Sequence, residues 1–348
     1  MSEPLLAGYD ALLLDLDGTV YRGAEIVDGA AEAVAAAHQA GVAVRYVTNN
    51  ASRGPEAVAE QLTGLGIPAK PDEVTTSAQA AVGVLADRLA PGSTVLVVGA
   101  DSLADEVTNR GLVPVRTAGP EVVAVVQGLS RDVGWHELAE ATVAIRAGAL
   151  WVASNMDRTL PTERGLLPGN GALVAAVRAA TDVEPLVAGK PARPLMDDSI
   201  AASDSRHPLV VGDRLDTDIA GANAVGVDSL LVLSGVATPA DLLAADETHR
   251  PTYLAADLSG ALHPADTQRF TESPDWSVHV VDGTLRLTAT DPAADGPASA
   301  TSGSALTALR ALCAAWWPQG TGPVGVRAEG PAAEAAVSKL GLASETSG

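Results

Sequence analysis

Two carboxylates and a glycine follow an apolar run near the start of the chain, at Asp15, Asp17 and Gly18. The run before them is short enough for a buried strand, so both acids are expected at the carboxyl end of a parallel sheet, where open α/β sheets bind ligands. A carboxylate at Asp15 could attack phosphorus and form an aspartyl phosphate. Asp17 could protonate the leaving group and later activate water, while Gly18 lets the backbone turn close to the phosphate. The alternative is that both acids only close a turn.

Three further segments carry side chains suited to the same chemistry. Thr48 and Asn49 follow a second β-rich run and could bind phosphoryl oxygens. Lys190 stands between a glycine and a proline at a predicted loop, where it could neutralise the phosphoryl group and orient Asp15. A third apolar run ends in Gly-Asp, which places Asp213 at the end of another strand. Each of these residue types is common at such a position, and only their order along the chain points to phosphate chemistry.

This chemistry requires a cation, because paired carboxylates would repel a phosphate dianion. Mg²⁺ binds through few carboxylates and keeps several waters. We therefore expect Asp15, the main-chain carbonyl of Asp17, and Asp213 as its ligands. Asp218 has two interpretations, either as a residue that supports the metal site or as a first-turn acid favoured by the helix dipole.

In their order, these segments resemble the four motifs of the haloacid dehalogenase superfamily of phosphatases, and the resemblance covers roughly residues 8–262. By motif position it implies the following roles: nucleophile for Asp15, general acid/base for Asp17, phosphate ligands for Thr48 and Lys190, and metal ligand for Asp213. An acid at Asp17 and the Asp213 cluster favour hydrolysis of a phosphate ester over attack on carbon. The resemblance thus implies a Mg²⁺-dependent phosphomonoesterase.

Segments 153–161 and 169–173 resemble the cap of the branch that contains the NagD-type, phosphoglycolate and glycerol-3-phosphate phosphatases. A mobile cap excludes water and selects the leaving group. Asn155, Asp157 and Arg158 are therefore candidates for substrate selection. The alternative is that Asn155 and Asp157 simply form a turn.

The resemblance implies glycerol 3-phosphate as substrate, with glycerol and phosphate as products and a role in glycerophospholipid metabolism. Phosphoglycolate, pyridoxal phosphate and nucleoside monophosphates are the alternative substrates. A different class of function is a non-catalytic sensor of a phosphorylated metabolite, in which a C-terminal module reports cap closure. Asp15 and Asp17 argue against the sensor, because a binding protein needs neither a nucleophile nor an acid.

The composition limits the choice of partners. The chain has 348 residues, with 22 basic and 43 acidic side chains and a formal net charge of −21. This balance argues against nucleic acid and against anionic membranes, and leaves a small phosphorylated metabolite as the expected partner. The single cysteine, Cys313, excludes an intramolecular disulfide. The N-terminal residues do not read as a signal peptide, so a cytoplasmic location is predicted.

Apolar strands that alternate with alanine-rich helices predict an α/β fold with a Rossmann-like, doubly wound parallel sheet as its core. An inserted α/β cap domain and a small α+β C-terminal module are expected beside this core, and self-association through either is considered. The predicted limits are 1–80 and 184–262 for the core, 81–183 for the cap, and 263–348 for the C-terminal module. A helix over residues 28–40 is expected to stop at Gly41.

The C-terminal module is predicted to follow a linker at residues 263–275. Its first two strands are expected on either side of Asp282-Gly283, a hairpin dipeptide. The predicted β-β-α-β-α order resembles part of the GCN5-related acetyltransferase fold. The glycine-rich pyrophosphate loop of that family is not seen in the sequence, so acetyl transfer is not expected. Trp316 and Trp317 are interpreted as core packing rather than as a surface for a partner.

Overall fold

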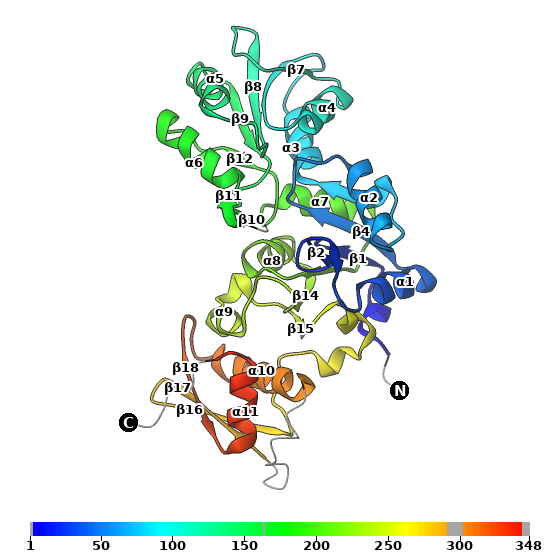
Figure 1. The fold of residues 1–348 in the computed structure, drawn as a ribbon, viewed down its shortest axis with the longest axis vertical. Helices are drawn as coiled ribbons and strands as arrows, with labels where there is room; N and C mark the ends of the chain where they lie inside the picture. The colour runs from blue at the N-terminus through cyan, green and yellow to red at the C-terminus, as the bar shows by residue number, and fades with distance from the viewer. Residues whose placement is uncertain (1–2, 163, 291–301, 343–348) are drawn as a thin grey trace. The chain divides into compact units, whose positions relative to one another are not determined.

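The computed structural model describes residues 3–162, 164–290 and 302–342. The chain forms two compact units. The first comprises the described residues up to Val44 and from Arg206 onward, and the second comprises Arg45–Ser205. Both contain parallel α/β sheets, and the first also carries a small mixed sheet near its C-terminal end (Figure 1). The predicted fold class is confirmed.

The sheet of the first unit has strands in the order β15-β14-β13-β1, and all its pairs are parallel. These strands are almost continuously apolar because both faces of the sheet are covered. Their bounds are β1 (Ala11–Leu14), β13 (Pro208–Gly212), β14 (Asp228–Val232) and β15 (Tyr253–Ala255). In the register of β1 and β13, Leu14 pairs with Val211, so the residues after both strands lie at the same edge.

Short helices and one hairpin join these strands. Their bounds are η1 (Leu5–Gly8), β2 (Tyr21–Arg22), β3 (Glu25–Ile26), α1 (Ala30–Ala40), η3 (Leu215–Ile219), α8 (Ala220–Val225), α9 (Pro239–Ala244), η4 (Glu247–His249), η5 (Leu258–Leu262) and η6 (Ala265–Thr267). Helix α1 ends at Gly41, which adopts a left-handed conformation with φ of 72°. The predicted stop at this glycine is confirmed.

The second unit contains a five-stranded parallel sheet with the order β12-β9-β8-β6-β7. Its strands are β6 (Thr94–Val98), β7 (Val113–Val115), β8 (Val122–Gln127), β9 (Leu150–Ala153) and β12 (Leu186–Val187). Helices α5 (Trp135–Arg146) and α6 (Asn170–Thr181) cover one face, and α3 (Ser77–Ala86) and α4 (Asp101–Asn109) the other (Figure 1). Buried side chains of α5 and α6, such as Ile145 and Val177, form one apolar cluster with Leu96 and Trp151 of the sheet.

The remaining elements of the second unit precede and follow this sheet. They are β4 (Ala43–Thr48), which begins in the first unit, α2 (Pro55–Gly64), η2 (Pro71–Glu73), β5 (Val74–Thr76), the antiparallel hairpin β10 (Thr159–Thr162) and β11 (Gly165–Pro168), and α7 (Arg193–Ala202). Strands β4 and β5 pair in parallel, with Thr48 opposite Thr76. The predicted domain limits stay predictions. The limit at 183 falls just before β12, which pairs with β9.

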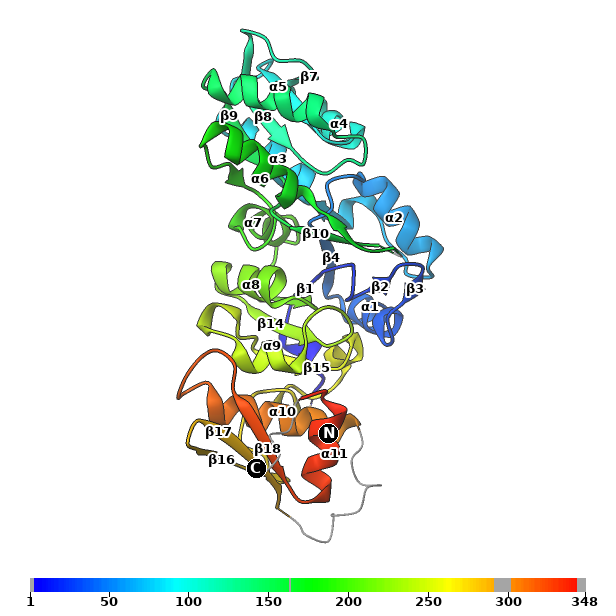
Figure 2. The ribbon, with the colours of Figure 1, turned by 60° about the vertical axis from the view of Figure 1, so that its left-hand side comes forward.

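The C-terminal module has the predicted β-β-α-β-α order. Its elements are β16 (Trp276–Val281), β17 (Thr284–Ala289), α10 (Ser302–Trp316), β18 (Gly325–Glu329) and α11 (Pro331–Lys339). Strands β16 and β17 pair antiparallel around Asp282 and Gly283, whose φ angles of 51° and 75° suit a tight hairpin. Strand β18 pairs in parallel with β17, and helices α10 and α11 pack against this sheet (Figure 2).

The segment predicted as a linker is packed against the core. Gln268 is buried, and its Nε2 donates to the carbonyl of Gly260 at 2.7 Å. Arg269 forms an isolated bridge with Tyr253 of β15. Further along, the apolar cores of the sheet and of the C-terminal module form one continuous cluster. Part of the stretch predicted as a linker, residues 263–275, therefore packs against the core through Gln268 and Arg269.

The tryptophan pair is part of this packing. Trp316 and Trp317 are partly buried against the shared cluster, and the ring of Trp317 lies 4.5 Å from that of Phe270, centroid to centroid. Cys313 is fully buried, and burial raises the pKa of its thiol. Among the helices of the described residues, none combines the length and the apolar character needed to cross a membrane.

Candidate active site

Three carboxylates converge at the edge of the sheet in the first unit. Asp15 follows β1, Asp213 follows β13, and Asp218 lies in the π-helical turn η3 just beyond. One carboxylate oxygen from each lies within 4.8 Å of the others. Asp213 and Asp218 are almost fully buried, whereas Asp15 is partly exposed. The structure thus brings together two predicted site residues and the residue for which the sequence left two interpretations.

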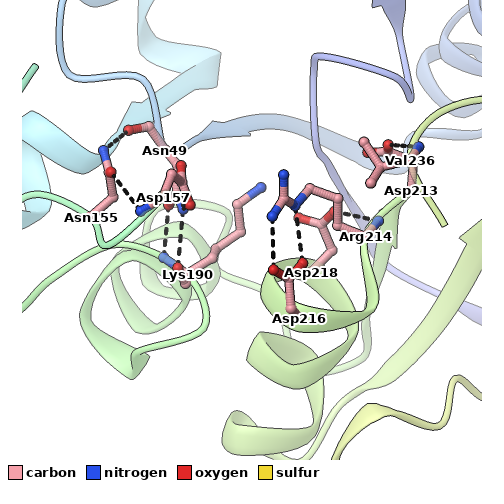
Figure 3. Close-up of polar contacts among 9 residues, drawn as sticks. All are labelled: Asn49, Asn155, Asp157, Lys190, Asp213, Arg214, Asp216, Asp218 and Val236. Atoms are coloured by element: carbon pink, nitrogen blue, oxygen red, sulfur yellow. Dashed lines mark hydrogen bonds and ion pairs between the residues drawn. The ribbon is translucent and has the colours of Figure 1, made fainter. Parts of the chain in front are cut away.

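The loop after β14 holds Asp213 in place. The N–H of Val236 donates to Oδ2 of Asp213 at 2.6 Å, as Figure 3 shows, and the N–H of Ala237 donates to the Asp213 carbonyl at 2.9 Å. Gly235 must lack a side chain, because a Cβ there would lie 1.9 Å from the same Oδ2. The hydroxyl of Ser234 donates to the carbonyl of Gly18 at 2.6 Å. This loop therefore ties the Asp213 carboxylate to the turn that follows Asp15.

Asp218 supports the backbone after β13. Its Oδ2 accepts from the N–H of Arg214 at 3.1 Å, while the Arg214 guanidinium pairs with Asp216 through two hydrogen bonds (Figure 3). Gly212 is required here as well, because a Cβ would lie 2.3 Å from the Cβ of Asp218. Asp218 thus belongs to the carboxylate cluster and also holds the Arg214 backbone, so it is not only a first-turn acid of a helix.

These three carboxylates fit a divalent cation. Ionised carboxylates are costly to bury without compensating positive charge, and the cluster brings oxygen ligands of the kind that Mg²⁺ prefers within reach of one another. We infer that Asp15, Asp213 and Asp218 would surround the metal. The role of Asp218 as a direct ligand or as a support stays a prediction.

Asp17 and Gly18 form the turn after Asp15. Asp17 is exposed, and its role as general acid/base stays a prediction. Gly18 adopts φ of 93°, and a Cβ there would lie 2.4 Å from Oδ2 of Asp213. A side chain at this position would collide with the Asp213 carboxylate. The turn therefore needs glycine for both its conformation and its close approach.

A second group of predicted residues lies in the second unit. The side chain of Asn49 forms two hydrogen bonds with the backbone of Lys190. Its Oδ1 accepts from the lysine N–H at 2.8 Å, and its Nδ2 donates to the lysine carbonyl at 3.0 Å. Nδ2 of Asn49 also lies 3.2 Å from Oδ1 of Asp157 (Figure 3). Lys190 is buried, and its Nζ donates to the carbonyl of Val47 at 2.9 Å. The geometry gives Asn49 a positioning role, and direct phosphate binding by Asn49 stays a prediction.

The segment with the cap candidates is built from internal hydrogen bonds. Nδ2 of Asn155 donates to the Asn49 carbonyl at 2.7 Å, and its Oδ1 accepts from the Asp157 N–H at 3.2 Å (Figure 3). The second bond is an Asx turn, which supports the turn interpretation. Arg158 is exposed. Selection of substrate by Asn155, Asp157 and Arg158 stays a prediction.

Thr48 ends strand β4 and is buried, with 4% of its surface exposed. Its Oγ1 accepts from the N–H of Asn50 at 3.1 Å. A threonine hydroxyl in this arrangement still has its own proton to donate. Binding of a phosphoryl oxygen by Thr48 stays a prediction.

The Ser234–Val236 loop was not predicted from the sequence. Serine, glycine and valine carry no distinctive chemistry, so residue type alone did not mark them. The available signal was position, because they follow β14, the strand beside β13 in the parallel sheet. Residues after neighbouring parallel strands meet at the same edge.

The parallel sheet and the carboxylate cluster at its edge define a haloacid dehalogenase-like hydrolase, and the chain belongs to this family. The family model for haloacid dehalogenase-like hydrolases matches residues 12–113, and a HAD-hydrolase-like model matches residues 187–261. A third model, for a GCN5-related N-acetyltransferase like domain, matches residues 273–342. The resemblances noted from the sequence are confirmed in both parts of the chain.

Similarity to individual phosphatases supports the same family assignment. The chain is 50% identical to a D-glycerol 3-phosphate phosphatase of Mycobacterium tuberculosis over 281 residues, which cover 81% of this chain and 79% of the relative. An acid sugar phosphatase of Staphylococcus saprophyticus is 38% identical over 73% of this chain and 97% of its own length. The crystal structure of the glycerol phosphate phosphatase from M. tuberculosis, in complex with magnesium, matches with a TM-score of 0.91 at 45% identity, covering 99% of this chain and 100% of that one.

Proposed function

We propose that this protein is a phosphomonoesterase that hydrolyses glycerol 3-phosphate to glycerol and phosphate through an aspartyl phosphate on Asp15. The observation that carries the proposal is the convergence of Asp15, Asp213 and Asp218 at the sheet edge. The substrate is supported by the 50% identity to the D-glycerol 3-phosphate phosphatase. Magnesium as cofactor is supported by this carboxylate cluster and by the magnesium complex of the similar structure.

The reaction divides into two displacements at phosphorus. In the first, a carboxylate oxygen of Asp15 attacks, the ester P–O bond breaks, and Asp17 gives its proton to the departing glycerol oxygen. In the second, Asp17 takes a proton from water as the water oxygen attacks, and the P–O bond to Asp15 breaks. When bound, Mg²⁺ supplies positive charge that offsets the carboxylates and the phosphate. Phosphate is released, and Asp15 returns as a free carboxylate.

Lys190 and Thr48 are proposed to bind the phosphoryl oxygens. A buried ammonium is a strong partner for a phosphate, because water does not screen it. Asn49 would hold the lysine backbone through the two hydrogen bonds described above. Asn155, Asp157 and Arg158 would act on the glycerol side of the substrate or shape the loop that does.

Other expectations stay proposals. They are a cytoplasmic location, self-association through the inserted domain or the C-terminal module, and a preference for a small phosphorylated metabolite over nucleic acid. Phosphoglycolate, pyridoxal phosphate and nucleoside monophosphates are competing substrates. A phosphometabolite sensor would bind one of these compounds without turnover.

The test is phosphate release from a panel of these four classes of substrate, with and without Mg²⁺, by the wild type and by Asp15→Asn. We expect kcat/KM to be highest for glycerol 3-phosphate, with release lost after chelation and in the variant. A higher value for another ester would replace the substrate and keep the mechanism. Binding without release of any ester would contradict the proposal and favour the sensor.

A further inference from the structure

The C-terminal module and the candidate metal site are attached to opposite ends of one short helix, α9. At the N-terminal side, the N–H groups of Val236 and Ala237 donate to Asp213 at 2.6 and 2.9 Å. At the C-terminal side, Nε1 of Trp317 donates to the Leu242 carbonyl at 3.3 Å. The N–H of Gly322 donates to the Ala244 carbonyl at 2.9 Å. The helix therefore links the module to the loop that holds Asp213.

Apolar packing makes this link stiff. Ala237, Leu242 and Leu243 belong to the same buried cluster as Leu312 and Cys313 of α10. Close-packed side chains of this kind transmit displacement, because they leave little free volume to absorb it. A change in how α10 sits would therefore reach Ala237 and the hydrogen bonds that it and Val236 make.

Arg250 forms hydrogen bonds at the C-terminal end of α9. Its Nε donates to the Ala245 carbonyl at 3.2 Å, and its Nη2 donates to the Gly320 carbonyl at 3.1 Å. Its guanidinium carbon lies 5.2 Å from the centroid of the Trp317 ring. Arg250 thus joins the residue after α9 to the turn of the C-terminal module that follows α10.

At the other end of α9 the cap is regular. Oγ1 of Thr238 accepts from the N–H of Asp241, and Oδ2 of Asp241 accepts from the N–H of Thr238 at 3.0 Å. This reciprocal capping box fixes the start of the helix at Pro239, with Thr238 as N-cap directly after Ala237. Both ends of α9 are therefore fixed, one to the metal-site loop and one to the module.

We propose that Trp317 is a positioning residue for the metal site, through which the C-terminal module holds α9 and thereby the Asp213 carboxylate. The module's contribution is to the affinity for Mg²⁺. The inference rests on the proposed function only in taking Asp213 as a metal ligand. It requires no ligand for the acetyltransferase-like module itself.

The test is the dissociation constant for MgCl₂ alone, measured by isothermal titration calorimetry on the full chain without substrate. Trp317→Phe keeps an aromatic ring and removes the Nε1–H that bonds Leu242. We expect Mg²⁺ affinity to fall roughly threefold to tenfold, which is less than the loss of about 10- to 100-fold typical of residues bonded to a metal ligand, because Trp317 acts on Asp213 only through α9. At saturating Mg²⁺, kcat should return to near the wild-type value.

Val337→Ala is the matched control. Val337 lies in the same apolar cluster but on α11, which packs on α10, β17 and β18. It should lower the thermal stability and leave the Mg²⁺ dissociation constant within about twofold of the wild type. An equal loss of Mg²⁺ affinity in Val337→Ala would overturn the specific role of Trp317, because general loosening of the module would then explain both.

If Trp317→Phe does not fold, a second variant tests the same link between the module and the metal site. Arg250→Met keeps the aliphatic stem and removes the hydrogen bonds to Ala245 and Gly320. It is expected to weaken Mg²⁺ binding in the same direction, and an unchanged dissociation constant in either folded variant would overturn the proposal. Failure of the wild type to hydrolyse glycerol 3-phosphate would contradict the proposed function and leave this result standing, since the measurement uses no substrate.

Discussion

The carboxamide of Asn49 is hydrogen-bonded to both backbone groups of Lys190, although the two residues are 141 positions apart. Oδ1 accepts from the lysine N–H at 2.8 Å, and Nδ2 donates to its carbonyl at 3.0 Å. Gly189 makes this approach possible, because a Cβ there would lie 2.6 Å from Oδ1 of Asn49. Asn49 thus fixes the backbone from which the Lys190 side chain extends.

Asn49→Asp tests this positioning role. The change keeps one acceptor but replaces the donor with an oxygen that faces the Lys190 carbonyl and the Asp157 carboxylate. We expect kcat/KM to fall about 10- to 100-fold, as for residues behind a metal or substrate ligand. Steady-state phosphate release measures it. Asn109→Asp, at an exposed position near the end of α4, is the control, and equal losses in both would contradict the role.

Lys190→Met tests the proposed phosphate contact. Methionine keeps an unbranched side chain and removes the positive charge, so we expect kcat/KM to fall about 100-fold or more. Inhibition by inorganic phosphate should weaken in parallel. Lys70→Met, which removes an exposed lysine of the same unit, should leave both values near those of the wild type. Unchanged phosphate inhibition in Lys190→Met would show that Lys190 does not bind the phosphoryl group.

Gly235→Ala tests the close approach around Asp213. The new Cβ would lie 1.9 Å from Oδ2 and 2.7 Å from Cβ of Asp213, so the carboxylate or the loop must move. We expect Mg²⁺ affinity to fall about tenfold or more. Gly64→Ala is the control, because Gly64 is the last residue of α2 and a Cβ there meets nothing within 4 Å. It should be neutral or stabilise by up to about 1 kcal/mol. Full Mg²⁺ affinity in Gly235→Ala would contradict the account of this loop.

Much of the candidate site could be predicted from the sequence because its chemistry lies at strand ends. Asp15 and Asp213 each follow a short apolar run, and parallel strands bring such positions to one edge. The choice between the two interpretations of Asp218 needed the structure, because only the turn η3 places its carboxylate with those of Asp15 and Asp213. The Ser234–Val236 loop could not be predicted, since its contribution is mainly backbone N–H groups and the absence of a side chain.

In the C-terminal module, too, some features could be predicted from the sequence and others could not. The hairpin of β16 and β17 was predictable because Asp282-Gly283 favours positive φ angles between two alternating strands. The packing of Gln268 was not, because glutamine and its polar neighbours resemble a linker and only the fold supplies the Gly260 carbonyl as a partner. Long-range hydrogen bonds of this kind leave no local pattern in a sequence.

Glu106 on α4 gives a pH prediction. Burial raises the pKa of its carboxyl above the usual range, and the negative charge of Glu56 adds to the effect. The folded chain then binds this proton more tightly than the unfolded chain, so ionised Glu106 lowers the free energy of unfolding at pH 7. This destabilisation decreases as the pH falls through the raised pKa of folded Glu106. It is absent below the ordinary glutamate pKa of about 4.3, where the carboxyl is protonated in both the folded and the unfolded chain.

Glu106→Gln should therefore raise Tm slightly at pH 7, and the gain should disappear toward pH 4. Differential scanning calorimetry at the two pH values measures the difference. Glu60→Gln, at an exposed position on α2, is expected to give no such gain. A gain in Glu106→Gln that is the same at both pH values would mean that hydrogen bonding or packing, rather than the charge, is responsible.

The central claim is that Asp15 becomes covalently phosphorylated. The most direct measurement is acid quenching of a reaction with [³²P]glycerol 3-phosphate and Mg²⁺, followed by counting of label on the protein. Wild type should carry label that hydroxylamine removes, as an acyl phosphate requires, and Asp15→Asn should carry none and release no phosphate. An Asp15→Asn protein that folds normally and still releases phosphate would contradict the account.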